Sequence, residues 1–292
     1  MPDPRNEMLS CDRTVRRGSC RRMFPVALAF LLFSACSVNN AKKSFVLAEK
    51  FWGDGQYGAA VVEFERAFVK DPKGKVGLQA LYRAAVTQAY FLSEYADAIR
   101  KLKIYAENSD NGPTVWEAKK LVGELLFSKL EDYDHATQHY RALVQMDPQA
   151  AEVPEFLFRI GKSRFYVGDF EEAIATYRQL TKQYSKTSWA EKAAYEIGVA
   201  YFTRGEQHPN GRGPVFENYQ EAIDAFEDFL EKYPSSPLLA EARFGIASCF
   251  EELDRLDAAQ QAYAALLTSY PSPKVIQIKL ARIRERKAQR SR

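Results

Sequence analysis

A repeated helical pattern is the feature of this sequence that most limits how the chain can fold. Six segments place an alanine at the same point of an apolar stretch with helical periodicity, and successive alanines are 38, 38, 37, 49 and 37 residues apart. A nearly constant period of this length indicates one small structural unit that is repeated along the chain. The six alanines are Ala60, Ala98, Ala136, Ala173, Ala222 and Ala259.

Each repeat contains two helical patterns. The residue twelve positions before each alanine lies near the end of the first pattern, and it is small or of middle size in five repeats, with Glu124 as the exception. Small side chains at matching points let two helix backbones approach closely. In four repeats a proline follows the second pattern, and proline ends a helix because it lacks a backbone donor. We therefore predict two antiparallel helices in each repeat.

This arrangement resembles the tetratricopeptide repeat over residues 44–272. The resemblance implies an all-α fold, a right-handed superhelical solenoid of about six helix hairpins. Residues 273–292 are predicted as a basic C-terminal capping helix and tail, because the end of a solenoid needs a polar outer face. The long interval of 49 residues contains the Gly- and Pro-rich residues 205–214, which predict a surface loop within an insertion at 205–219. This loop is either a partner contact or a tolerated insertion.

The N-terminus predicts export from the cytoplasm. Arg21 and Arg22 precede the uncharged residues 23–35, and this run is shorter than the roughly 20 apolar residues that span a bilayer. A basic segment, an apolar run and small residues in this order are typical of a signal peptide, here over residues 1–35. The start of translation is one of three residues, Met1, Met8 or Val15.

Cys36 follows the small residues Ser34 and Ala35, and this junction resembles the lipobox of bacterial lipoproteins, with Phe33 where that motif has leucine. The resemblance implies that Cys36 becomes the first mature residue and carries a diacylglycerol and a further acyl chain. Several acyl groups anchor a protein stably, whereas one chain binds a membrane only marginally. Residues 36–43 would then form a short tether, and we expect no cofactor other than this lipid.

The distribution of charge argues against a nucleic-acid partner. Of the net charge of +3, residues 1–22 contribute +3 and residues 274–292 contribute +7, which leaves −7 for the residues between them. A folded body with excess negative charge repels phosphate groups. We therefore expect protein partners and a membrane, reached through the lipid anchor, and no nucleic acid.

The sequence also lacks the motifs of common catalytic sites. Gly161-Lys162-Ser163 has no upstream glycine at the position that a phosphate loop requires. His135 and His139 are four residues apart, but no third metal ligand lies near them in the sequence. We predict that the chain is not an enzyme and has no metal and no small-molecule substrate. An enzyme with its site in the loop at 205–214 is the remote alternative.

The resemblance to tetratricopeptide repeats also implies a binding surface. In such repeats the concave face is lined by residues of the first helix that lie three before, one after and four after the crossing point. An extended or helical segment of a partner protein would bind there through apolar anchors, unless neighbouring repeats bury part of the aromatic row. The predicted groove residues are Phe45, Trp52, Arg83, Thr87, Tyr90, Phe158, Lys162, Phe165, Tyr195, Phe202 and Phe244.

Two families of Gram-negative envelope proteins share these features. The repeat array, the short tether and the segment at 233–242 resemble BamD-type lipoproteins of the outer-membrane β-barrel assembly machinery and CpoB-type periplasmic proteins that coordinate cell-wall synthesis. Lipidation and a mature length of 257 residues, which is 292 less 35, favour the BamD type. The resemblance implies a non-catalytic scaffold on the periplasmic face of the outer membrane. A CpoB-like role and a lipoprotein of pilus or secretion assembly are the alternatives.

Overall fold

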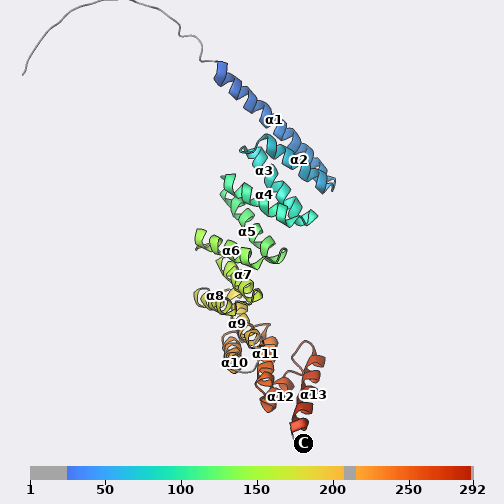
Figure 1. The fold of residues 1–292 in the computed structure, drawn as a ribbon, viewed down its shortest axis with the longest axis vertical. Helices are drawn as coiled ribbons and strands as arrows, with labels where there is room; N and C mark the ends of the chain where they lie inside the picture. The colour runs from blue at the N-terminus through green and yellow to red at the C-terminus, as the bar shows by residue number, and fades with distance from the viewer. Residues whose placement is uncertain (1–24, 207–214, 291–292) are drawn as a thin grey trace, which may run out of the picture. The chain divides into compact units, whose positions relative to one another are not determined.

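The computed structural model describes the backbone of residues 25–206 and 215–290, and the side chains of residues 39–206 and 217–290. These residues form thirteen α-helices and one π-helical turn and contain no strand (Figure 1). The predicted all-α fold is therefore confirmed. The elements are α1 (Pro25–Gly53), α2 (Tyr57–Lys70), α3 (Lys75–Thr87), η1 (Gln88–Leu92), α4 (Tyr95–Asn108), α5 (Gly112–Ser128), α6 (Tyr133–Met146), α7 (Val153–Tyr166), α8 (Phe170–Gln183), α9 (Ser188–Glu206), α10 (Val215–Lys232), α11 (Leu239–Glu252), α12 (Leu256–Ala265) and α13 (Pro273–Arg290).

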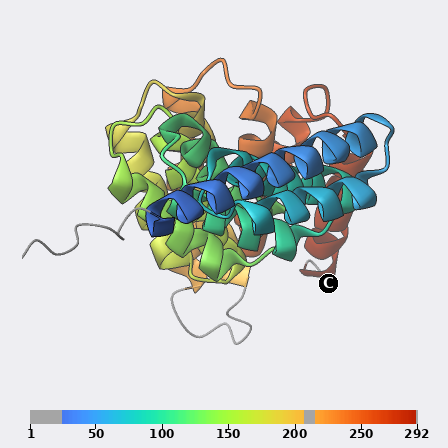
Figure 2. The same cartoon turned by 90° about the horizontal axis from the view of Figure 1, so that it is seen from above.

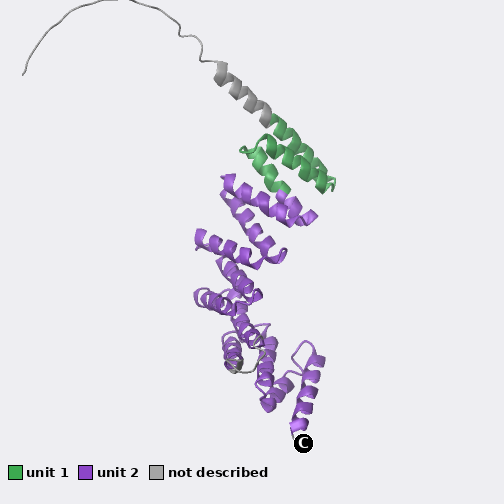
Figure 3. Cartoon of the chain, in the orientation of Figure 1, with its two compact units in different colours: residues 1–84 green, residues 85–292 purple. Residues whose placement is uncertain are grey.

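The helices pack in the order in which they occur in the chain. The chain divides into two compact units, residues 1–84 and residues 85–292 (Figure 3). In the first unit α1 lies along α2 (Figure 2). In the second unit each helix from α4 to α13 packs against the next, and α9 also packs against α7 and α11. Contacts restricted to near neighbours are the mark of a solenoid of helix pairs, so the predicted repeat array is confirmed.

The crossing points of the helix pairs are fully buried. All six repeat alanines have no exposed surface. A Cβ atom on Gly161 would lie 2.3 Å from a ring carbon of Tyr177, so α7 and α8 approach this closely only because glycine has no side chain. In the third repeat Gly123 lies against the ring of Tyr140, while Glu124 is exposed. The crossing point of that repeat is therefore Gly123, one residue before the predicted position.

The structure differs from the predicted tether. Residues 36–43 belong to α1, which is helical from Pro25 onwards. Ala41 and Ser44 are buried, and Lys70 of α2 donates a hydrogen bond to Ser44 Oγ at 2.9 Å. Ala41, within the predicted tether, is therefore part of a packed helix. The side chain of Cys36 and most of the predicted signal peptide lie outside the described residues.

The predicted insertion at 205–219 is shorter than expected. Helix α9 continues to Glu206 and α10 begins at Val215, so both ends of the predicted loop are helical. Asn218 is buried, and its Oδ1 accepts a hydrogen bond from Nε of Arg204 at 2.9 Å. This contact holds the first turns of α10 against α9. The middle of the predicted loop, residues 207–214, lies outside the described residues.

A left-handed backbone conformation recurs at the turn between the two helices of a repeat. Five residues with positive φ lie 38, 38, 37 and 86 residues apart, and the last interval equals 49 plus 37, as for the alanines. A residue in this conformation ends a helix by turning its last carbonyls toward following backbone N–H groups. Glycine adopts it without strain, whereas other residues pay a steric cost. The five residues are Gly55, Ser93, Glu131, Gly168 and Asp254.

Glu131 tests this turn directly. An L-residue with positive φ costs roughly 1–2 kcal/mol. Glycine removes this cost, but it loses more conformational entropy on folding, which offsets part of the gain. Glu131→Gly is therefore expected to raise the free energy of unfolding by about 0.5–1 kcal/mol. Urea denaturation followed by circular dichroism measures the change. The reverse substitution Gly168→Glu, at the equivalent position, is expected to lower it. A destabilising Glu131→Gly would contradict the strain argument.

Candidate protein-binding surface

The predicted groove residues of the first unit are held in place by neighbouring side chains. The Nε and Nη2 atoms of Arg83 donate to the two carboxylate oxygens of Glu49 at 2.9 and 3.0 Å. The guanidinium of Arg83 also lies 4.8 Å from the ring centroid of Trp52. Phe45 meets Phe64 edge-to-face at 5.5 Å. Since Phe45, Trp52 and Arg83 are half-buried, they form an ordered surface in which part of each side chain remains accessible.

Thr87 and Tyr90, two further predicted groove residues, differ widely in exposure. Thr87 is only 1% exposed, whereas Tyr90 is 61% exposed. Thr87 ends α3, and Tyr90 lies in the π-helical turn η1 that follows it. A π-turn inserts an extra residue and shifts the direction of the side chains that follow. The exposed Tyr90 side chain stays available to a partner, whereas the short side chain of Thr87 lies beneath the surface, where a partner does not reach it.

The other predicted aromatic residues of the second unit are half-buried against neighbouring helices. Each ring packs on an aromatic ring of a later helix or turn, with centroids 4.9–5.7 Å apart, a range in which aromatic pairs attract. Burial of the aromatic row is therefore partial, as the alternative interpretation of the sequence allowed. The pairs are Phe158 with Trp189, Phe165 with Phe170, Tyr195 with Phe226, Phe202 with Tyr219, and Phe244 with Tyr270.

Lys162 supplies the polar contact of this aromatic face. Its ammonium lies 3.2 Å from both carboxylate oxygens of Glu196 on α9. It also lies 5.2 Å from the ring centroid of Phe165 and 5.0 Å from that of Tyr166. Burial raises the pKa of the neighbouring Tyr195 hydroxyl to about 12, with the Glu196 carboxylate adding to the shift. The face therefore offers a neutral phenol and a paired charge between rings whose positions are fixed.

Helix α13 covers the end of the array. Glu251 of α11 is 1% exposed, and its carboxylate accepts hydrogen bonds from Lys279 at 3.0 Å and from the Tyr263 hydroxyl at 3.2 Å. Arg282 and Arg286 of α13 lie 3.5 and 3.8 Å from the other oxygen. A buried carboxylate is tolerated only with such partners. Basic residues of the C-terminal helix therefore hold it against the last repeat.

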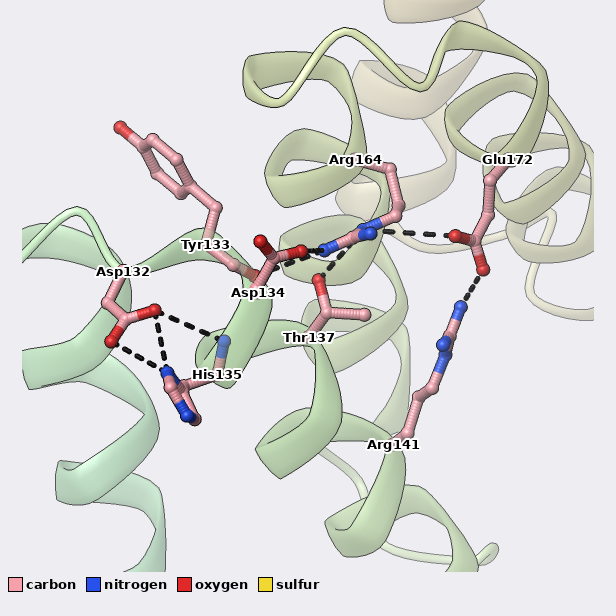
Figure 4. Close-up of polar contacts among 8 residues, drawn as sticks. All are labelled: Asp132, Tyr133, Asp134, His135, Thr137, Arg141, Arg164 and Glu172. Carbon is pink, nitrogen blue, oxygen red and sulfur yellow. Dashed lines mark hydrogen bonds and ion pairs between the residues drawn. The ribbon is translucent and has the colours of Figure 1, made fainter.

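An arginine network links three helices of the second unit (Figure 4). Arg164 of α7 donates to Asp134 at 2.6 Å and to the Thr137 hydroxyl at 3.1 Å, both on α6. Its Nε lies 3.8 Å from Glu172 of α8, which also pairs with Arg141 of α6. Hydrogen bonds to charged groups are among the stronger ones in proteins. One arginine therefore joins three successive helices.

Arg204 repeats this arrangement one repeat later. It lies on α9 and reaches Glu171 of α8 at 3.0 Å, Glu221 of α10 at 2.6 Å and Asn218 of α10 at 2.9 Å. Adjacent acids in the first turn of α8, Glu171 and Glu172, thus pair with three arginines from three different repeats, Arg141, Arg164 and Arg204. Sequence reasoning missed this network. The available signal was an arginine near the end of the first helix in both repeats.

The two histidines considered as metal ligands, and the cysteine Cys249, have structural roles. His135 lies 2.8 Å from the Asp132 carboxylate, which caps the start of α6 (Figure 4). His139 donates from Nε2 to the Lys119 carbonyl at 2.8 Å, and burial lowers its pKa. Burial also raises the pKa of the Cys249 thiol to about 12. Across residues 39–206 and 217–290, no group of three His, Cys, Asp or Glu side chains could hold a metal ion.

Removing the Arg164 side chain tests the network. Arg164→Ala is expected to lower the free energy of unfolding by about 2 kcal/mol, since hydrogen bonds to charged groups contribute roughly 1.5–3 kcal/mol and Asp134 and Glu172 lose a shared partner. Arg141→Ala is the matched control, with an expected loss below about 1 kcal/mol because its pair with Glu172 is more exposed. Equal losses for the two variants in urea denaturation would show that Arg164 does not connect the helices.

Comparison with known proteins supports the repeat assignment. Two family models described as tetratricopeptide repeat match the chain, one at residues 83–151 and 216–272 and the other at residues 155–187 and 192–236. The matched residues begin within α3 and run through the end of α12. They therefore cover the helix pairs of the second unit. None of the helices within residues 25–206 and 215–290 is long and apolar enough to cross a membrane.

Among curated proteins, the chain is similar to the outer membrane protein assembly factor BamD of Caulobacter vibrioides, with 29% identity over 117 residues. The match covers 38% of this chain and 34% of that protein, so the chain spans about a third of the length of this relative. Among solved structures it is similar to PilW, a type IV pilus biogenesis factor, with 17% identity, a TM-score of 0.49, and coverage of 82% of this chain and 98% of PilW. It is also similar to YrrB, a tetratricopeptide-repeat protein with an unusual peptide-binding site, with 18% identity, a TM-score of 0.47, and coverage of 72% and 97%. The matched repeats and the packing of the helix pairs agree, and the chain belongs to the tetratricopeptide-repeat family, whose helical scaffold serves protein–protein interaction.

Proposed function

We propose that this protein is a non-catalytic scaffold that is anchored by lipid to the periplasmic face of the outer membrane. In this proposal it binds segments of partner proteins of the β-barrel assembly machinery. The observation that carries the proposal is the half-buried aromatic row on α7, α9 and α11 with the ion pair of Lys162 and Glu196 in it. We name this row, formed by Phe158, Lys162, Phe165, Tyr195, Phe202 and Phe244, the aromatic face.

The aromatic face suits an extended peptide better than a reaction. Its rings are already held by other rings, so binding of a partner loses little side-chain conformational entropy there. Aromatic side chains with accessible edges act as the main energetic anchors of protein interfaces. The paired charges of Lys162 and Glu196 offer a donor and an acceptor to the polar backbone of a bound segment. The ionisable groups of the face are the ion pair of Lys162 with Glu196 and the neutral phenol of Tyr195, which suit polar contacts with a bound segment.

Sequence features of the N-terminus support the membrane location. The signal-peptide pattern over residues 1–35 is followed directly by Cys36, and lipoproteins carry their lipid on a cysteine in this position. The similarity of 117 residues to the BamD protein of Caulobacter vibrioides supports the β-barrel assembly machinery as the site of action. The residues between 23 and 273 carry a net charge of −7. Anionic lipid surfaces attract basic segments and not acidic ones, so attachment of this part of the chain to a membrane would depend on the lipid on Cys36.

Lipidation is tested at the cysteine. In cells labelled with radioactive palmitate, the wild-type chain is expected to carry label and to sediment with the outer membrane, because acyl groups on Cys36 insert into the bilayer. Cys36→Ser is expected to lose both properties. Cys249→Ser removes a buried thiol and is expected to keep them. Label that persists in Cys36→Ser would show that the anchor lies elsewhere.

The aromatic face is tested by photocrosslinking in living cells. A photoreactive residue at Phe202 or Lys162 is expected to crosslink an outer-membrane β-barrel assembly protein, because both positions lie on the face that is proposed to hold the partner. The control position is Gln179, an exposed residue of α8 that lies away from the aromatic face. Mass spectrometry identifies the partner.

The three results have different meanings. Recovery of pilus, secretion or cell-wall proteins from Phe202 or Lys162 would retain the scaffold and assign it to another envelope machine. Equal crosslinking from Gln179 would show that the aromatic face does not select a partner. No crosslink from Phe202 or Lys162, in chains that keep their helical circular dichroism, would reject the aromatic face as the binding surface.

A further inference from the structure

Helix α1 has a packed side and an exposed side. It lies along α2 in the first unit (Figure 2). Its buried residues Ala41, Ser44 and Ala48 recur at spacings of three and four, which places them on the packed side of the helix. Four exposed residues with the same kind of spacing form the other side, which we call the α1 outer face. They are Lys43, Val46, Leu47 and Lys50.

Two apolar side chains lie exposed in the middle of the α1 outer face. Val46 is 60% exposed and Leu47 is 40% exposed. The terminal helix of a solenoid needs a polar outer face, because no further repeat covers it. Apolar groups on one side of a basic helix bind at the surface of a bilayer, where they enter the boundary between headgroups and acyl chains. The α1 outer face therefore suits a lipid surface better than it suits water.

The charge of this part of α1 favours an anionic surface. Between residues 39 and 53 the basic residues are Lys42, Lys43 and Lys50, all of them exposed, and the one acid is Glu49. Glu49 pairs with Arg83 at 2.9 Å, so it does not neutralise the lysines. None of the three lysines forms an ion pair within residues 39–206 and 217–290. In a chain segment with a net negative charge, this is a local basic surface whose charges remain available.

The other basic helix of the chain, α13, uses its charges differently. Five of its seven Lys and Arg residues form ion pairs with acids of the last repeat, which are Glu251, Asp254 and Asp257. The charges of α13 therefore hold that helix in place. The lysines of α1 have no such acids opposite them, and an anionic lipid surface would supply the missing negative charge.

The α1 outer face lies close to the proposed site of lipidation. Cys36 belongs to the same helix, and at a rise of 1.5 Å per residue Lys43 follows it by about 10 Å along the axis. Electrostatic attraction reaches about 8–10 Å at moderate ionic strength. An anchor at Cys36 would therefore bring Lys43 within reach of headgroup phosphates. Attraction of Lys43 would tilt α1 toward the membrane and bring Lys50 after it.

We propose that α1 lies flat on an anionic lipid bilayer, with Val46 and Leu47 among the headgroups and with Lys43 and Lys50 on lipid phosphates. The long stems of the two lysines allow their ammonium groups to reach the phosphates while the apolar side chains between them are buried. The lipid on Cys36 supplies the attachment, and the α1 outer face determines which side of the first unit turns toward the membrane. This inference rests on the proposed attachment at Cys36 and adds an orientation to it.

Fluorescence quenching measures contact between the α1 outer face and lipid. The full chain, with an environment-sensitive fluorescent amino acid at position 46, is reconstituted into vesicles of phosphatidylethanolamine and phosphatidylglycerol with brominated acyl chains. Position 46 is expected to be quenched, because bromine quenches only fluorophores that contact it. The same fluorophore at Gln79, an exposed residue of α3, is expected to remain bright. Phosphatidylcholine in place of phosphatidylglycerol is expected to weaken quenching at position 46, since it removes the anionic charge.

Charge reversal tests the role of the lysines. A lysine at an anionic surface contributes roughly fivefold to the population that is bound there. The double variant Lys43→Glu, Lys50→Glu is therefore expected to lower the ratio of quenched to unquenched chains at least about tenfold. Lys186→Glu is the matched control, because it makes the same change at an exposed lysine between α8 and α9, and it is expected to leave the ratio unchanged. Circular dichroism verifies that each variant keeps its helices.

Mass spectrometry of the same samples separates failure of the anchor from failure of the α1 outer face. A chain without lipid on Cys36 that is still quenched at position 46 rejects the lipid anchor and retains the face. A lipidated chain that is quenched equally at positions 46 and 79, or that the double variant leaves unchanged, overturns the face and retains the anchor. A chain that neither carries lipid nor binds the vesicles overturns both.

A protein occupant of the α1 outer face would give a different result. In detergent without phospholipid, the emission at position 46 is expected to be independent of protein concentration. An emission shift that grows with concentration would assign the face to a second copy of the chain and overturn the lipid proposal.

Discussion

The close contact between a small residue on one helix and an aromatic ring on the next is the constraint on which the rest of the structure depends. Gly161 against Tyr177 and Gly198 against Phe226 leave no room for even one methyl group. Such contacts fix the distance and the angle at which two helices cross. Once that angle is fixed, side chains three or four residues away must point along the same face. The aromatic face and the arginine network are both consequences of this geometry.

The periodic part of the fold could be predicted from the sequence because it is encoded locally. The repeat alanines report burial at a helix crossing, and all six are buried. The departures are local. A π-helical turn follows Thr87, and residues 36–43 are helical where a tether is predicted. Neither feature leaves a recognisable pattern in the sequence.

Polar contacts between repeats were less predictable than apolar ones. Glu49 with Arg83, Lys162 with Glu196, and Glu251 with Lys279 join the first helices of successive repeats, over sequence separations of 28 to 34 residues. Many charged residues lie at such separations, and a sequence does not say which rotamers meet. Of the candidate groove residues, the aromatic ones could be named from the repeat register, but their degree of exposure could not, because it depends on the rings opposite them.

Helix α13 lies where the first helix of a further repeat would pack, against α12. Three of its basic residues lie within 4 Å of the one buried carboxylate of α11, and its outer surface carries charged side chains such as Lys274, Arg284 and Glu285. A solenoid with an open apolar end would add copies of itself end to end, as head-to-tail contacts do when they build filaments. Because α13 buries Ile276, Leu280 and Ile283 against this end of the array, the apolar surface there is covered and does not offer such a head-to-tail contact.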